Sequence, residues 1–98
     1  MSLPIVLRPE AEADLTEARA WYERQRAGLG AEFANSVEEL LTRVQQMPEV
    51  YAIVLPGVRR AKLRRFPYVT YYRVLADRIE VIAVLHGGRD PAGWQSRA

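Results

Sequence analysis

In the first quarter of the chain, the spacing between hydrophobic residues changes at Pro9. Residues 3–8 (LPIVLR) are mostly aliphatic, which predicts a short strand. After Pro9, apolar side chains recur at helical spacing: Ala11, Leu15, Ala18 and Tyr22. Proline suits a first helical turn, and the acidic residues that follow suit the positive end of a helix dipole. A first helix is therefore predicted from Pro9 to the glycines of residues 27–31.

A second apolar stripe with helical spacing follows these glycines and stops before Pro48. Its members are Phe33, Val37, Leu40, Leu41, Val44 and Met47. So short a connection between two helices predicts an antiparallel helical hairpin. Residues 48–57 (PEVYAIVLPG) have prolines near both ends, and we expect them to form a loop that returns to the sheet.

The chain after Gly57 has the two-residue period of strands. In residues 58–65 (VRRAKLRR), Ala61 and Leu63 share one face, and the other face carries three cations: Arg60, Lys62 and Arg64. Residues 68–75 and 78–86 predict two further strands, joined by a tight turn at Ala76-Asp77.

The last predicted strand is apolar on both faces in its second half. Val81, Ala83 and Leu85 would lie on one side, and Ile82 and Val84 on the other. A strand with two apolar faces is typical of the centre of a sheet. The order is therefore β-α-α-β-β-β, an α+β fold in which a helical hairpin packs on one face of a curved, mostly antiparallel sheet. We expect residues 1–98 to form a single domain.

Composition excludes several kinds of site. The chain has no cysteine and one histidine, so disulfides, thiolate nucleophiles and histidine-rich metal centres are not expected, and neither is a cofactor. The apolar runs are too short for a signal peptide or a membrane span. We expect a cytoplasmic protein with no membrane partner.

Charge divides the chain in two. Residues 1–50 hold nine acids and five arginines, a balance of −4, whereas residues 51–98 hold three acids and nine bases, a balance of +6. Such asymmetry predicts that the second half carries the surface for an acidic or phosphate-bearing partner.

The strand with Arg60, Lys62 and Arg64 has two interpretations of about equal weight. Alternate side chains on a strand are spaced so that the three cations could follow a phosphate backbone or an acidic segment. Alternatively, the charges protect an edge strand from aggregation. Arg73 alternates with Tyr71 on the next strand, which means that this face is partly open or that the arginine is paired. We expect the neighbouring tyrosines to belong to the core.

The stretch HGGRDPAGW, residues 86–94, also has two interpretations. His86 and Arg89 are suitable types for metal-free RNA cleavage, which needs a proton acceptor and cations for the phosphorane. A lone histidine where a strand meets a glycine turn is more often structural, and we favour that interpretation. Trp94 is then expected to dock the tail onto the body of the protein.

These motifs together resemble toxins of the RelE/ParE superfamily from type II toxin–antitoxin (plasmid stabilisation) systems. The order of an arginine-bearing strand, an FPY turn, a YYRV strand, an apolar strand and an HxxRDPxxW tail is similar to the second half of these toxins. The first half agrees through PEAEADL and GLGAEF. The resemblance implies a growth inhibitor neutralised by a cognate antitoxin, which wraps the toxin and alone contacts DNA.

The family divides by target, and the resemblance favours the ParE-like branch, which acts on DNA gyrase. The ribosome-dependent RelE-like branch, which cleaves mRNA, carries a further arginine where this chain has Val69 and a tail tyrosine that is absent near Trp94. Family positions map onto Arg60, Lys62 and Arg89 as binding residues, with Arg64 and Arg73 beside them. The alternative is an endoribonuclease in which His86, Arg73 and Arg89 are catalytic. A further alternative is an interaction module without toxicity.

Overall fold

The computed structural model describes residues 2–87 and 92–97 of the chain. Its elements follow the order β1 (Ile5–Leu7), α1 (Pro9–Gln25), α2 (Leu29–Gln46), β2 (Ala52–Leu55), β3 (Val58–Lys62), β4 (Tyr68–Val74), β5 (Ile79–His86) and α3 (Ala92–Gln95). Within the described ranges, no helix is long and apolar enough to cross a membrane.

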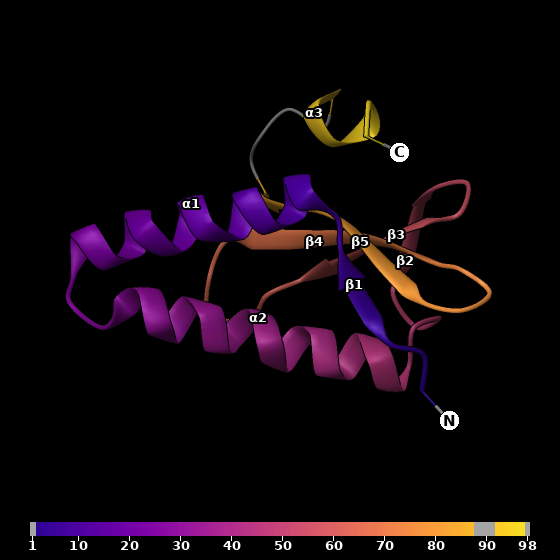
Figure 1. Cartoon of the computed structure of the whole chain (residues 1–98), viewed down its shortest axis with the longest axis horizontal. Coiled ribbons are helices and arrows are strands. Elements are labelled where there is room, and N and C mark those ends of the chain that lie inside the picture. Colours follow the sequence, from indigo (N-terminus) through magenta and orange to yellow (C-terminus); the bar gives the residue numbers. More distant parts are fainter. Residues whose placement is uncertain (1, 88–91, 98) are drawn as a thin grey trace.

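One sheet runs through the molecule in the order β1-β5-β4-β3-β2. β1 pairs in parallel with β5, and the other neighbours are antiparallel. Helices α1 and α2 lie side by side, and the short α3 lies apart from them (Figure 1). The predicted α+β architecture is therefore confirmed, with β5 in the interior of the sheet as expected.

The helices cover one face of the sheet with a large apolar core. α1 begins with Pro9, buries Ala11, Ala18 and Tyr22, and carries acids in its first turn. α2 buries most of the predicted stripe, but Met47 follows the helix as its C-terminal cap and is 59% exposed. The stripe thus ends one turn earlier than its sequence pattern indicated.

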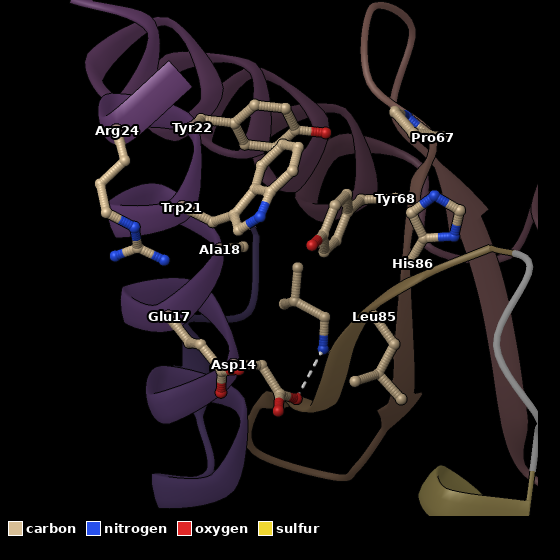
Figure 2. A pocket seen from close by; sticks show the side chains of 11 residues that line it. Asp14, Glu17, Ala18, Trp21, Tyr22, Arg24, Pro67, Tyr68, Leu85 and His86 are labelled. Carbon is tan, nitrogen blue, oxygen red and sulfur yellow. Dashed lines mark hydrogen bonds between the residues drawn. The ribbon is translucent and has the colours of Figure 1, made fainter. Parts of the chain in front are cut away.

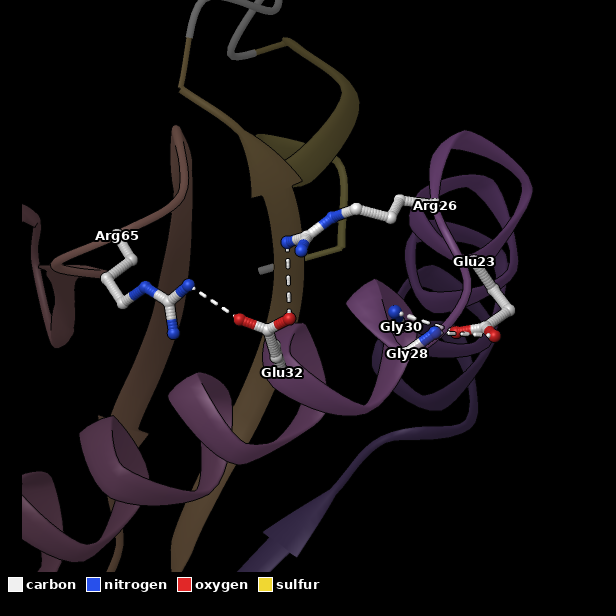
Figure 3. Close-up of polar contacts among 6 residues, drawn as sticks. All are labelled: Glu23, Arg26, Gly28, Gly30, Glu32 and Arg65. Atoms are coloured by element: carbon white, nitrogen blue, oxygen red, sulfur yellow. Dashed lines mark hydrogen bonds and ion pairs between the residues drawn. The ribbon is translucent and has the colours of Figure 1, made fainter.

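The turn between the helices depends on a close approach that only glycine permits. The Glu23 carboxylate accepts hydrogen bonds from the backbone N–H groups of Gly28 and Gly30, both at 2.9 Å (Figure 3), and these bonds lower the pKa of Glu23. A Cβ at Gly30 would lie 2.7 Å from the Arg19 carbonyl oxygen. The glycine therefore allows α2 to pack directly against α1.

A second carboxylate in this region ties α2 to the sheet. Glu32 pairs with Arg26 at 3.2 Å and with Arg65, in the loop after β3, at 2.7 Å (Figure 3). The hydrogen bond from Arg65 lowers the pKa of Glu32. The pairs are exposed, so they orient the loop more than they stabilise the fold.

The structure corrects the expected loop over residues 48–57, because residues 52–55 form the edge strand β2. The chain before β2 is held by two side chains of the sheet. Arg59 donates to the carbonyl oxygens of Glu49 and Tyr51 at 2.9 and 2.8 Å, and the Tyr72 hydroxyl donates to Pro48 at 2.6 Å. The prolines flank this strand, and they do not interrupt it.

A β-bulge corrects the predicted faces of β5. Tyr71 pairs with Ala83 but Tyr72 pairs with Val81, which leaves Ile82 as an extra residue. Ile82 and Ala83 consequently lie on the same side, with Val69 and Tyr71, whereas Val81 and Val84 join the core under the helices. Strict alternation fails here, so the predicted grouping of Val81 with Ala83 was wrong.

Candidate functional site

The basic strand predicted from the sequence is β3, and it lies inside the sheet. Arg60 pairs with Tyr71 and Lys62 pairs with Val69, so both cations lie on the face away from the long helices, which we call the tail face. Arg60 is half-buried and Lys62 is exposed. Since β2 covers its outer side, β3 is not the protected edge strand of the alternative interpretation.

Arg64 lies beyond the end of this strand. The predicted strand over residues 58–65 ends at Lys62, and Arg64 belongs to the exposed loop that leads to β4. The backbone N–H of Leu63 still donates to the Tyr68 carbonyl at 3.0 Å, which keeps the loop close to the sheet. Of the three predicted cations, the strand therefore presents Arg60 and Lys62 together.

The C-terminal tail covers the apolar part of the tail face. Trp94 of α3 stacks on Tyr71 with ring centroids 4.0 Å apart and an interplanar angle of 14°, and the Trp94 side chain is 3% exposed. This is the docking role expected of Trp94. Arg60 and Lys62 of β3 therefore lie beside an apolar surface that the Trp94 ring already covers.

Arg73 is paired, which is one of the two possibilities that the sequence left open for an arginine on this face. Its Nε lies 3.8 Å from a carboxylate oxygen of Glu80, the residue opposite it on β5. Both side chains are largely buried on the tail face. The positive charge of Arg73 is thus already countered within the protein. Arg89, the remaining predicted cation, lies outside the described residues.

His86 lies on the other face of the sheet. It is the last residue of β5 and pairs with Tyr68, whose ring packs on the core under the helices. The two rings meet edge to face with centroids 5.6 Å apart. The sheet therefore separates His86 from Arg60 and Lys62.

His86 borders a pocket of about 450 Å³ between α1 and the ends of β4 and β5, which we call the helix-side pocket (Figure 2). Aromatic residues form much of its wall, and Trp21 is 48% exposed there. Burial, and then the neighbouring Tyr68, raise the pKa of the Tyr22 hydroxyl. The carboxylates of Asp14 and Glu17 lie at its α1 side (Figure 2).

Sequence reasoning did not find this pocket. The only signal was the Trp21-Tyr22 pair, which places an extra aromatic residue beside the buried stripe of α1. Periodicity assigns Tyr22 to the core, as the structure does, but it does not show that Trp21 faces a hollow in the surface. That hollow depends on where β4 and β5 end relative to α1.

An ion pair closes the free edge of β5 next to this pocket. β1 ends at Leu7, and beyond it the Asp14 carboxylate accepts a hydrogen bond from the Val84 N–H at 3.1 Å. Arg97 donates to Asp14 at 2.6 and 3.2 Å and to the Ile82 carbonyl at 3.3 Å. The hydrogen bond with the Asp14 carboxylate raises the pKa of Arg97. The Asp14–Arg97 pair thus bonds to backbone groups of β5 that a further strand would otherwise pair with. Next to this pair, the Arg8 guanidinium donates to the carbonyl oxygen of Arg97.

Comparison with known families identifies the chain. Residues 5–91 match the family model described as the ParE toxin of the type II toxin–antitoxin system parDE. The chain belongs to the ParE toxin family. It is therefore a ParE-type toxin within the RelE/ParE superfamily, as the resemblance implied. Among curated protein sequences, no relative matches it.

Solved structures of this superfamily share the fold of this ParE-type chain. A chromosomal ParDE system from P. aeruginosa matches with a TM-score of 0.77 and 21% identity, over 87% of this chain and 96% of that one. A mutant of the E. coli toxin RelE in complex with a peptide of its antitoxin RelB matches with a TM-score of 0.67 and 16% identity, over 100% and 96%. The RelE mutant in its free state matches with a TM-score of 0.64 and 18% identity, over 100% of this chain and 95% of that one.

Proposed function

We propose that this toxin inhibits growth by binding DNA gyrase through the tail face, and that a cognate antitoxin neutralises it. The observation that supports docking over RNA cleavage is the separation of the basic residues from the histidine. Arg60 and Lys62 lie on the tail face, and His86, the one histidine of the chain, faces the helix-side pocket.

Catalysis would need a different arrangement of these groups. A general base acts within hydrogen-bonding reach of the proton that it removes, about 2.6–3.2 Å between heavy atoms, while cations hold the same phosphate. The Arg60 Nη2 reaches the end of β5, 3.7 Å from where a Cβ on Gly87 would lie, but the ring of the preceding His86 packs against Tyr68 on the other face, away from that guanidinium. A docking surface requires only accessible charge on a rigid support, and Arg60 and Lys62 beside the buried Tyr71–Trp94 stack provide that combination.

The antitoxin is proposed to bind both the basic residues of the tail face and the apolar helix-side pocket of the toxin. An acidic segment that folds on binding would complement Arg60 and Lys62 and cover the gyrase-binding face. The half-exposed Trp21 in the helix-side pocket offers a place for a bulky apolar side chain of the same segment. Neutralisation then follows because antitoxin and target compete for the tail face.

The experiment that tests the target is pulse-labelling of DNA and protein synthesis in the first minutes after the chain is induced without antitoxin. We expect DNA synthesis to fall first, with mRNA intact, and purified protein to block gyrase supercoiling. Combined Arg60→Glu and Lys62→Glu substitutions should abolish both effects, whereas His86→Ala should preserve them. Thermal unfolding of each variant controls for loss of structure.

Other outcomes would contradict the proposal. If translation falls first, mRNA is cut within codons and His86→Ala is inactive, the toxin is a ribosome-dependent endoribonuclease. If induction causes no growth arrest although antitoxin still binds, the chain is a non-toxic interaction module. Trp21→Ala tests the antitoxin separately, because it should weaken neutralisation and leave the inhibition of DNA synthesis unchanged.

A further inference from the structure

The surface around β2 is unusually apolar for an exposed part of this protein. Four of the seven large hydrophobic side chains that are exposed in the described ranges lie in residues 47–54: Met47, Val50, Ile53 and Val54. Ile53, in the middle of the strand, is 62% exposed. Residues 50–58 (VYAIVLPGV) include no charged side chain, so the one charge within residues 47–54 is the exposed carboxylate of Glu49.

β2 is also an edge strand, and the two sides of the sheet end differently. On the opposite side β1 is the other edge strand, and past its end the Asp14–Arg97 pair bonds to the backbone groups of Ile82 and Val84 on β5. β2 pairs with β3 on its inner side and ends the sheet on its outer side. Proteins usually protect such an edge with charge or with proline inside the strand. β2 is short and has a register shift between Ile53 and Leu55 in its ladder with β3, but it has neither charge nor proline, so its outer backbone remains open to another strand.

Charge decides which strand fits this edge. The guanidinium beside Ile53 belongs to Arg59, which already donates to the carbonyl oxygens of Glu49 and Tyr51. Arg60, opposite Ala52, extends away from β2, with its Nη2 3.7 Å from where a Cβ on Gly87 would lie. An acidic segment would therefore find no available cationic partner along β2 and would match the tail face better. The edge instead suits a strand that is itself uncharged, apolar and about four residues long. β2 of a second copy has these properties.

We propose that two copies of this chain pair through β2, antiparallel and about a two-fold axis, so that one sheet continues across both. The pairing buries Ile53 and Val54 of each copy against the other, and Met47 and Val50 extend the contact. Pro48 and Pro56 limit it to the residues between them, since proline supplies no N–H to a ladder. The interface is isologous, and β2 brings no charged side chain of its own into it. It does not depend on gyrase being the target.

The first test measures the mass of the purified full chain by sedimentation equilibrium over a range of concentrations. The wild-type chain should be a dimer, and Ile53→Lys should be a monomer. In a two-fold interface the substituted residue is present twice, once from each copy. We therefore expect Ile53→Lys to raise the dissociation constant of the dimer about hundredfold. Val6→Lys is the matched control, because Val6 is 46% exposed on β1 at the opposite side of the sheet. This control should remain dimeric.

A second test avoids a charged substitution and uses the absence of cysteine from the chain. Opposed residues of antiparallel strands lie close enough for a disulfide. Mild oxidation should therefore link Ile53→Cys into a covalent dimer far faster than Val6→Cys. A wild-type chain that stays monomeric, a dimer that Ile53→Lys leaves intact, or equal cross-linking of both cysteine variants would overturn the proposal. None of these results depends on toxicity or on antitoxin.

Discussion

The two faces of the sheet are built in different ways. Among the residues that the structure describes, the helix face holds a core of fourteen buried residues under two long helices, whereas the tail face holds six, covered by the short tail. The cations Arg60 and Lys62 lie on the tail face, beside the smaller cluster. Most of the folding free energy therefore comes from one face, while the other presents the surface that we propose for partners. The separation means that the two roles can be perturbed independently.

The largest expected effect comes from the aromatic centre of the helix face. Phe33 is fully buried and contacts the rings of Tyr22, Phe66 and Tyr68 at centroid distances of 5.1 to 5.3 Å. Phe33→Ala should lower the free energy of unfolding in urea by about 3–5 kcal/mol, because it leaves a cavity among these rings. Phe33→Leu is the control and should cost less than half as much. A loss below about 1 kcal/mol would contradict the assignment of the main core to this face.

A smaller effect is expected on the tail face. Trp94→Ala removes the stack on Tyr71 but releases only a short segment, so the free energy of unfolding should fall by about 2 kcal/mol. Amide hydrogen exchange should accelerate around Tyr71 and remain slow in α1. Trp21→Ala, at a half-exposed site, is the matched control and should change stability by about 0.5 kcal/mol. If exchange in α1 also accelerates, the two faces unfold as one unit.

The most local effect concerns a single proton on the helix face. Burial raises the pKa of Tyr72 to about 12, from an ordinary value near 10. The folded protein thus holds this proton more tightly than the unfolded chain. The resulting stability is complete below about pH 10 and is lost as the pH rises through 12. In absorbance at 295 nm, the last tyrosine to ionise should disappear in Tyr72→Phe.

The control for this titration is the alkaline unfolding curve. The free energy of unfolding should decline between pH 10 and 12 more steeply in the wild-type chain than in Tyr72→Phe. Parallel declines in the two proteins would show that the Tyr72 hydroxyl does not contribute. Because the same hydroxyl donates to the Pro48 carbonyl, the variant should also be slightly less stable at neutral pH.

Local patterns predicted most of the elements because each reflects contacts within a few residues. The stripes of α1 and α2, the alternation of β3 and the turn glycines were sufficient for the helical hairpin and the three later strands. β2 was missed because its neighbouring prolines suggested a loop. What makes it a strand is Arg59 and Tyr72, which hold the preceding residues against the sheet.

The candidate site was predicted in part. The sequence showed that the cations of residues 60–65 are concentrated on one segment, and the structure brings Arg60 and Lys62 together on one face. It did not show that Arg73 is paired with Glu80, that Trp21 borders a pocket, or that His86 faces the helices. These facts depend on register between strands, which a single residue of bulge can change.

The sequence by itself determined the α+β class, the helical hairpin, the basic second half and the membership of the ParE toxin family. Only the tertiary structure decided which face each group occupies and how each edge of the sheet ends. The Asp14–Arg97 pair joins residues 83 positions apart and bonds to the part of β5 that β1 does not cover, while the uncharged β2 leaves the opposite edge of the sheet open. Periodicity records the neighbours of a residue along the chain, and such long-range contacts appear only when the strands and helices are packed.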